Sequence, residues 1–400
     1  MIMKPMVRNN IFLNAHPAGC VRETQLQIAR ADILGARLAA SAAAPRLPKR
    51  VLVVGCSTGY GLASRIIAAF SYGASTVGFS FEREPTAAKP GSPGWYANRA
   101  FDAEAASRGL FTKSFNVDAF SKEATELAIS AAREGGFAYD LVVYSLASPV
   151  RVDPETGVMY RSTIKPIGRE YAGKTLDVFS GAISEARIQP ADEKEIAETV
   201  KVMGGEDWAR WIDELTAAGV LAKGASTVAY SYVGPQLSWP IYRDGTIGRA
   251  KTHLEASARE IARRHTAQGL NAYVSINKAV VTRASAVIPV IPLYVSTLFK
   301  VMKERHIHED CLDQMARLFD ERLYRRDGAS VPLDAEGRIR LDELEMGTSV
   351  QQEVSKRLAA ASEENLSSLT DLDGYREDFL RAHGFAVPGV DYEAEVDLLA

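Results

Sequence analysis

Tyr242 and Lys251 are the residues of this chain whose types and spacing most clearly suit proton transfer. A tyrosine hydroxyl can donate a proton to an oxygen atom, and a nearby lysine ammonium favours its ionisation by lowering the pKa of the hydroxyl. The two residues are nine apart, and residues nine apart on a straight helix point to opposite faces, because each residue turns the helix by about 100°. We therefore expect Tyr242 to lie in a loop and Lys251 to lie on a helix that begins near Thr246.

Two further tyrosines precede this pair on a predicted strand over 225–232. Tyr230 and Tyr232 are two residues apart, so their side chains should leave the strand in the same direction. Tyr232 lies ten residues before Tyr242 and could reach a substrate carbonyl. A place in an aromatic core is the alternative for both tyrosines.

A glycine-rich segment, Gly55 to Gly61, follows the apolar run Val51–Val54 and precedes a predicted helix over 60–72. Glycines at such a place let backbone N–H groups approach a pyrophosphate at the positive end of the helix. The spacing is Gly-x-x-x-Gly-x-Gly, not Gly-x-Gly-x-x-Gly, and a tight strand-to-helix turn is the alternative. The strand–turn–helix context favours a dinucleotide cofactor.

Glu82 ends the next predicted strand, about 20 residues beyond the glycines, where an acidic side chain can accept hydrogen bonds from the adenosine ribose. Its charge opposes a 2′-phosphate, so NADH is favoured over NADPH. Arg83 is the contrary signal, because an arginine can pair with that phosphate. A solvated surface glutamate is the alternative.

Later strand ends should lie at the same edge of the sheet, where ligands bind in folds of this kind. For Asp118 we consider a hydrogen bond to the adenine amino group, or a helix N-cap near Ser121. The segments that follow these strands are Asp118-Ala119, Leu146-Ala147 and Val280-Val281-Thr282.

Strands and helices alternate along the chain, which predicts an α/β fold with a doubly wound parallel sheet. We expect one enlarged Rossmann-type domain over 1–400, with its core at about 50–300, an insertion at about 149–200 and a mainly helical C-terminal region at about 300–400. Near the N-terminus we expect a strand over 7–13, a turn over 16–20 and a helix over 22–41. We interpret 83–98, rich in Pro, Gly and Ser, as a loop.

Composition excludes several classes of function. The 400 residues are 46% hydrophobic and carry a net charge of −3, so a nucleic acid is not an expected partner. Three separated cysteines argue against a disulfide framework and suit the cytoplasm. The N-terminus lacks the apolar core of a signal peptide, and the apolar stretch 284–298 is too short to span a membrane. The segment 306–311 collects metal-ligand types, but we expect no metal site.

Taken together, the motifs resemble the FabV-type enoyl-acyl carrier protein reductases and the closely similar trans-2-enoyl-CoA reductases, enlarged relatives of the short-chain dehydrogenases. The resemblance runs nearly end to end. Besides the glycine loop and the Tyr-x8-Lys pair, it rests on residues 4–8 (KPMVR), 16–20 (HPAGC), 93–96 (PGWY), 144–149 (YSLASP), 202–208 (VMGGEDW), 282–285 (TRAS) and 298–303 (LFKVMK).

The resemblance implies an NADH-dependent reduction of the trans-2 double bond of an enoyl thioester, in fatty acid biosynthesis. It implies that Tyr242 is the proton donor and Lys251 binds the cofactor. It also implies that Tyr232 contacts the substrate and helps Tyr242 to stabilise the thioester oxygen, as a secondary donor. The run 288–294 could supply an acyl channel, with core packing as the alternative. The implied NAD contacts are Gly55, Cys56, Ser57, Thr58, Gly59, Tyr60, Phe81, Glu82, Asp118, Ala119, Leu146, Ala147, Val280, Val281 and Thr282.

Two other functions use the same residues. A short-chain ketoreductase or alcohol dehydrogenase would apply the tyrosine to a ketone and would need an orienting serine, for which Ser238 is the nearest candidate. A non-catalytic dinucleotide sensor would tolerate loss of the tyrosine–lysine pair, which is present here. The sequence leaves open whether acyl carrier protein or CoA carries the substrate, the acyl chain length, the inhibitor sensitivity and the oligomeric state, for which a monomer is the working expectation.

Overall fold

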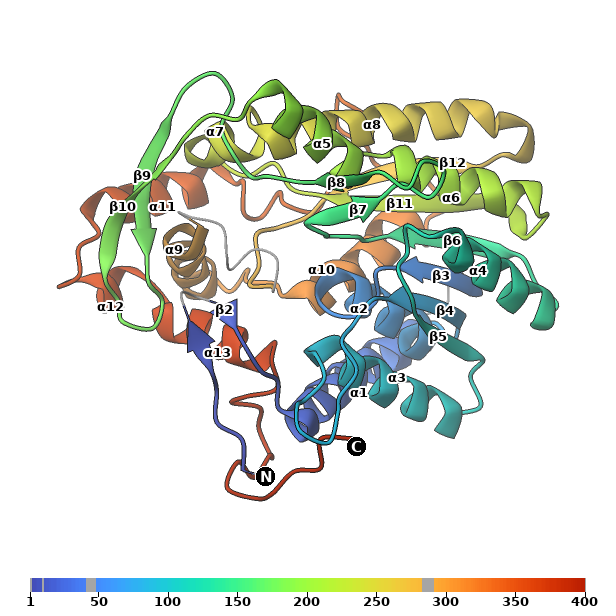
Figure 1. Cartoon of the computed structure of the whole chain (residues 1–400), viewed down its shortest axis with the longest axis horizontal. Coiled ribbons are helices and arrows are strands. Elements are labelled where there is room, and N and C mark those ends of the chain that lie inside the picture. The colour runs from blue at the N-terminus through green and yellow to red at the C-terminus, as the bar shows by residue number, and fades with distance from the viewer. Residues whose placement is uncertain (1, 9–10, 41–47, 283–290, 400) are drawn as a thin grey trace.

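Seven parallel strands form the central sheet of the protein, whose computed structural model describes residues 2–8, 11–40, 48–282 and 291–399 (Figure 1). Every neighbouring pair of these strands is parallel, so the predicted doubly wound sheet is confirmed. The first strand, β3, lies between β4 and β6, and this change of winding direction is where such folds bind ligands. In sheet order the strands are β13 Ile339–Arg340, β12 Asn271–Ile276, β11 Leu221–Ser231, β6 Tyr139–Tyr144, β3 Arg50–Val54, β4 Ser75–Ser80 and β5 Thr112–Asn116.

One face of the sheet is covered by helices from the N-terminal third of the chain and by α10. Val51 and Val53 of β3 point to this face and belong to a core cluster with residues of these helices. The α2 helix continues as a π-helical turn over Ile67–Ser71. The helices of this face are α1 Pro17–Ala39, α2 Gly59–Ile66, α3 Pro93–Ser107 and α10 Cys311–Arg317.

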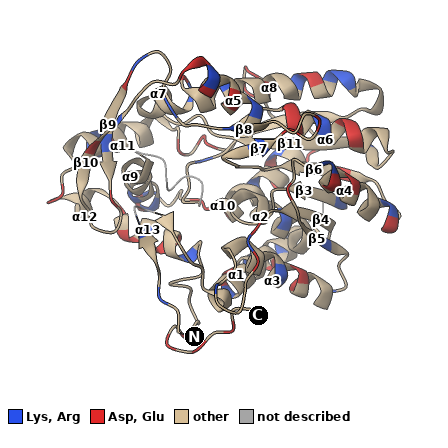
Figure 2. Cartoon of the chain, viewed as in Figure 1, with Lys and Arg blue, Asp and Glu red and all other residues tan. Residues whose placement is uncertain are grey.

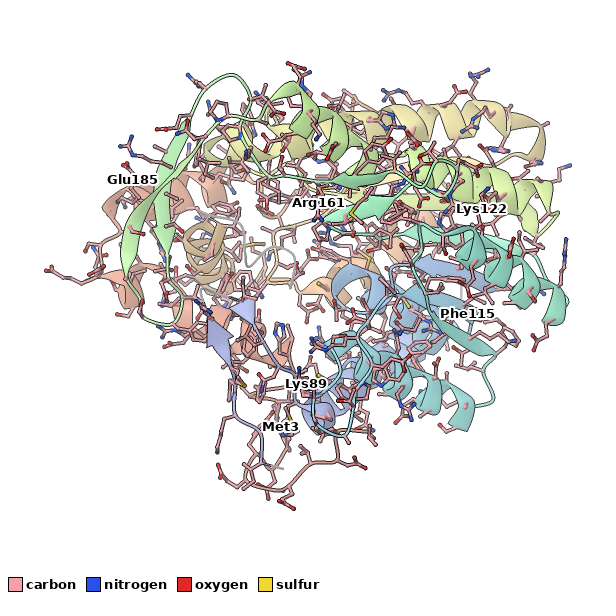
Figure 3. All side chains as sticks on the ribbon, viewed as in Figure 1. Met3, Lys89, Phe115, Lys122, Arg161 and Glu185 are labelled. Atoms are coloured by element: carbon pink, nitrogen blue, oxygen red, sulfur yellow. The ribbon has the colours of Figure 1, made fainter. Side chains whose placement is uncertain are left out.

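The opposite face carries α4 Lys122–Glu134, α6 Glu206–Ala217 and α8 Thr246–Arg264. Leu52 and Val54 alternate with the valines of the first face and pack here, as expected for a strand buried on both sides. Phe115 of the edge strand β5, labelled in Figure 3, stacks on Phe79 with ring centroids 5.1 Å apart.

Two hairpins and a further set of helices lie beside the sheet, and the second hairpin and the C-terminal helices are at the left of Figure 1. Two antiparallel hairpins occupy the predicted insertion, followed by α5 Glu193–Met203. The C-terminal helices pack with β9 and with Tyr242 in a separate core cluster. The hairpins are β7 Val150–Val152 with β8 Met159–Arg161, and β9 Tyr171–Leu176 with β10 Ile183–Ile188, and the helices are α9 Ile291–Glu304, α11 Thr348–Ala360, α12 Leu366–Leu369 and α13 Leu372–Arg381.

Three local predictions were wrong. The strand expected over 7–13 is a hairpin of β1 Val7–Arg8 and β2 Ile11–Phe12. The turn expected at 16–20 is the start of α1, with the His16 side chain capping the helix and Pro17 in its first turn, where a proline costs no hydrogen bond. The loop expected over 83–98 ends before Pro93, because α3 begins there, and a proline in the first turn of a helix again costs no hydrogen bond.

Acidic and basic residues alternate over the outer helices α4, α6 and α8 (Figure 2). Some of their ion pairs are exposed, such as the one between Arg263 and Glu260, and an exposed pair adds little to stability. Within the described ranges, no helix has both the length and the apolar character that crossing a bilayer needs.

Candidate active site

Tyr242 is the last residue of a short helix, α7 Trp239–Tyr242, and is almost fully buried. The loop expected around it is therefore helical, but Tyr242 still lies off the helix that carries Lys251, as their spacing predicts. That helix, α8, begins at Thr246. The Nζ atom of Lys251 donates a hydrogen bond to the carbonyl of Tyr230, 3.2 Å away.

Protonation of this pair is governed mainly by burial. The pKa of Tyr242 is raised above its ordinary value by burial and then by the charges of Tyr375 and Glu345, so the expected lowering by Lys251 is not seen. Burial lowers the pKa of Lys251 to about 8, against the opposing charge of Glu255. At neutral pH the site therefore holds a neutral phenol and a cationic amine, which suits a proton donor beside an anion-binding group.

Tyr232 packs edge-on against Tyr242, with ring centroids 5.0 Å apart. Its hydroxyl donates a 3.0 Å hydrogen bond to Glu345, a residue that no sequence motif had indicated. The side chain of Tyr230 does not point toward Tyr242, because its hydroxyl lies 2.6 Å from the hydroxyl of Ser64 of α2. The expectation that both tyrosines point in the same direction was wrong, because β11 ends at Ser231 and Tyr232, just beyond it, is the one that meets Tyr242.

The glycine loop lies against the end of β6. Gly55 has φ 92°, and a Cβ atom on it would lie 2.3 Å from the carbonyl oxygen of Ser145 and 3.1 Å from Leu146 Cδ2. Only glycine allows this approach. Thr58 precedes α2 and makes no side-chain capping bond to it, which leaves the first N–H groups of the helix for a phosphate.

Glu82 lies just beyond β4 and next to the glycine loop. A Cβ atom on Gly94, in the first turn of α3, would lie 2.4 Å from Ser57 Cβ and 2.9 Å from Glu82 Oε1. The backbone of Glu82 is held by Asn116, whose side chain accepts from its N–H at 2.7 Å and donates to its carbonyl at 2.9 Å. Gly94 and Asn116 were missed by sequence reasoning, although 93–96 is one of the resembling motifs.

The neighbouring strand ends expose groups to the same edge. Phe81 is 76% exposed, so its ring offers a free face beside Glu82. Asp118 does not cap α4. Its Oδ1 accepts from Phe120 N at 3.0 Å, while Ser121 caps the helix. The carbonyl of Ala119 accepts from the Trp211 indole at 3.0 Å and is part of the core. Ala147, beyond β6, is exposed.

Val280, Val281 and Thr282 return to the glycine loop after β12. A Cβ atom on Gly59 would lie 3.5 Å from Thr282 Cγ2, and the Tyr60 hydroxyl donates to the carbonyl of Lys278 at 2.7 Å. A cavity of about 200 Å³ is lined by both segments together with Phe299. Residues 288–290 of the expected acyl channel lie outside the described residues.

Cys56 points away from this cavity. Its thiol is fully buried, 3.5 Å from Asn98 Oδ1 and 3.8 Å from an Arg65 nitrogen, and burial raises its pKa. Any cofactor contact of Cys56 must therefore come from its backbone. Among the residues that the structure describes, no cluster of His, Cys, Asp and Glu could hold a metal ion.

Three family models match the chain. The "NAD(P)H binding domain of trans-2-enoyl-CoA reductase" matches residues 2–87 and the "trans-2-enoyl-CoA reductase catalytic region" matches 89–324. The "enoyl reductase FAD binding domain" matches 333–396. The glycine loop suits a dinucleotide. All residues of the segment 333–396 are described, and they form no unit of a strand, a glycine turn and a helix. The segment therefore does not fit a flavin in the way that the glycine loop suits a dinucleotide.

Curated relatives match over almost the full length. The trans-2-enoyl-CoA reductase [NADH] of Treponema denticola is 53% identical over 99% of both chains. The enoyl-[acyl-carrier-protein] reductase [NADH] of Flavobacterium johnsoniae is 51% identical over 99% of this chain and 98% of the relative.

Solved structures agree with this match. The crystal structure of the Treponema denticola trans-2-enoyl-CoA reductase in complex with NAD superposes with a TM-score of 0.95 at 53% identity, over 99% of this chain and 98% of that one. The Clostridium acetobutulicum enzyme in complex with NADH gives a TM-score of 0.94 at 41% identity, over 100% and 98%. This chain therefore belongs to the family of trans-2-enoyl-CoA reductases and enoyl-acyl carrier protein reductases.

Proposed function

We propose that the protein reduces the trans-2 double bond of enoyl thioesters with NADH, as a step of fatty acid biosynthesis. The observation that carries this proposal is the buried phenol of Tyr242, whose raised pKa keeps its proton available, and which packs on Tyr232 in the same core cluster as Ala279 and Val281. The names of the two relatives supply the substrate class and the cofactor.

The residues fit a bound dinucleotide. The N-terminus of α2 and the glycine loop would hold the pyrophosphate, Glu82 the adenosine ribose and Lys251 the nicotinamide ribose, with Val280–Thr282 against the nicotinamide. When bound, NADH supplies a hydride to the β-carbon of the enoyl thioester.

Negative charge then develops on the thioester oxygen, as an enolate. The Tyr242 hydroxyl donates a hydrogen bond to that oxygen and supplies the proton that the product requires, either directly or through water. The Lys251 ammonium stabilises the tyrosinate that forms. Burial of Tyr242 excludes bulk water, which strengthens both interactions.

We propose that the whole chain acts as one domain, because the site draws on residues from the sheet, from α7 and α8 and from the C-terminal segment. One chain supplies them all, so a monomer would suffice. Acyl carrier protein or CoA carries the substrate. None of the three cysteines, Cys20, Cys56 and Cys311, is in a disulfide bond, which suits the cytoplasm.

Ketone reduction receives no support from the site. Ser238, the candidate orienting serine, is fully buried and its hydroxyl donates to the carbonyl of Pro235 at 2.9 Å. It is therefore not free to orient a carbonyl substrate. Measuring NADH oxidation separately with crotonyl-CoA and acetoacetyl-CoA tests the proposal. Turnover with crotonyl-CoA and none with acetoacetyl-CoA is expected, and the reverse would establish a ketoreductase.

A further inference from the structure

Glu345 is a fully buried carboxylate that the proposed chemistry does not use. It follows β13 in the C-terminal segment, and its side chain extends into the candidate active site. Its Oε1 accepts from the hydroxyls of Tyr232, at 3.0 Å, and Tyr294, at 2.6 Å. Its Oε2 accepts from the N–H of Ala279 at 2.7 Å, the residue directly before Val280–Thr282.

These contacts join two parts of the site that are far apart in sequence. Ala279 leads into the segment expected to meet the nicotinamide, while Tyr232 packs on the ring of the proton donor Tyr242. A buried carboxylate needs such partners, because burial alone raises its pKa and favours its neutral form. The hydrogen bonds from Tyr294 and Ala279 and the charge of Lys278 oppose that effect in part, and the pKa of Glu345 stays above its ordinary value.

The number of protons on its hydroxyl limits the hydrogen bonds that Tyr232 can donate. A phenol has one proton, and Tyr232 donates it to Glu345 Oε1. Only its lone pairs then remain for other partners, so Tyr232 is not a second proton donor to the thioester oxygen. Its ring, held by Glu345, instead forms a wall against Tyr242.

We propose that Glu345 is a positioning residue, which holds Tyr232 against Tyr242 and in register with the cofactor segment that begins at Ala279. The inference rests on the proposed function. It assigns to the C-terminal segment a role in the reduction through one side chain.

The test compares Glu345→Gln with wild type and with Glu343→Gln as a matched control. An amide has a single acceptor oxygen, so the side chain of the Glu345→Gln variant cannot serve both the tyrosines and Ala279. A buried hydrogen-bonding group that loses its partner is costly, and we expect kcat with crotonyl-CoA to fall about 10- to 100-fold. Glu343 pairs with Arg317 and Arg322 at the surface, so its variant should keep kcat within about twofold.

A double-variant cycle distinguishes positioning from general stability. If Glu345 acts through Tyr232, adding Glu345→Gln to Tyr232→Phe should lower kcat by less than about threefold further. Full multiplication of the two losses, or wild-type kcat in Glu345→Gln, would overturn the proposal. Should Glu345→Gln not fold, Glu345→Asp serves in the same cycle, because it keeps the carboxyl group but withdraws it from its partners by one methylene group. Wild type that fails to oxidise NADH with crotonyl-CoA would refute the proposed function instead.

Discussion

At the scale of single residues, the catalytic phenol is held in its protonated form by its surroundings. Burial raises the pKa of Tyr242, whereas a lysine placed to ionise it would have lowered that pKa. The amine of Lys251 lies against a backbone carbonyl and is itself depressed in pKa. Tyr242 therefore supplies a proton, and Lys251 supplies a positive charge.

Removing the Tyr242 hydroxyl should slow the chemistry alone. Tyr242→Phe keeps the ring that packs on Tyr232, and loss of one oxyanion donor costs about 10²–10³-fold in turnover. NADH affinity, followed by its fluorescence, should stay within about twofold. Tyr324→Phe is the control, because that buried hydroxyl has no hydrogen-bond partner in the described structure. Turnover of Tyr242→Phe within a few-fold of wild type would transfer the proton-donor role elsewhere.

Lys251 predicts the alkaline limb of the pH profile. Its pKa lies at about 8, so the ammonium is present below that pH and is lost as the pH rises through it. kcat/KM for NADH, which reports ionisations of the free enzyme, should therefore fall above pH 8 with a slope of about one. Lys251→Met should have a low kcat/KM and no such limb. A flat wild-type profile between pH 7 and 9.5 would contradict this assignment.

Glu82 predicts the preference between the two dinucleotides. Its carboxylate beside Ser57 opposes a 2′-phosphate, and after solvent screening we expect about 1–2 kcal/mol in favour of NADH. Glu82→Gln should narrow the ratio of kcat/KM values for NADH and NADPH by about 5- to 30-fold. Glu84→Gln, at an exposed position two residues on, should leave that ratio unchanged. Equal use of both cofactors by wild type would exclude the ribose role.

At the scale of elements, helix α3 closes one side of the predicted cofactor site. Its first turn approaches Ser57 so closely that only glycine fits at position 94. Gly94→Ala would force the helix and the glycine loop apart, so KM for NADH should rise about tenfold or more, with a lower melting temperature. In Gly347→Ala the added Cβ meets nothing closer than 3.6 Å, so this control should behave as wild type. An unchanged KM in Gly94→Ala would show that α3 does not shape the site.

The elements were predictable where a local pattern determines them. β3 is an apolar β-branched run, so it was placed within one residue of its observed start. The start of α3 at Pro93 was missed, because Pro and Gly are typical of loops as well as of first helical turns. Glu345 could not have been found in this way, since it meets Tyr232 across 113 positions and no spacing rule connects them.

At the scale of the whole molecule, a buried arginine links the sheet to α3. Arg65 is fully buried, donates to Thr112 and Ser114 on β5 at 2.7 and 2.6 Å, and lies 4.1 Å over the ring of Phe101. These contacts join three elements around the glycine loop. A side-chain network of this kind stabilises the fold when every buried polar group in it has a partner, because each unpaired buried group costs free energy.

Arg65→Ala should therefore destabilise the fold. It leaves several buried acceptors unpaired, and such a loss costs about 3–5 kcal/mol in the free energy of unfolding. Urea titration followed by circular dichroism measures the change. Arg325→Ala removes an ion pair with Asp327 near the surface and should cost less than about 1 kcal/mol. Equal midpoints of urea unfolding for Arg65→Ala and Arg325→Ala would show that the Arg65 network adds nothing to stability.

The place of β13 at the edge of the sheet has a consequence for synthesis of the chain. β12 leaves the ribosome well before residues 339–345, so its outer edge stays unpaired and Tyr232 lacks its carboxylate until that stretch emerges. Until then the nascent chain presents an open strand edge, to which a chaperone or another chain can pair. The stretch that contains β13 and Glu345 thus both covers the end of this strand edge and completes the wall beside Tyr242, so a chain stalled before residue 339 should turn over substrate far more slowly than the finished protein.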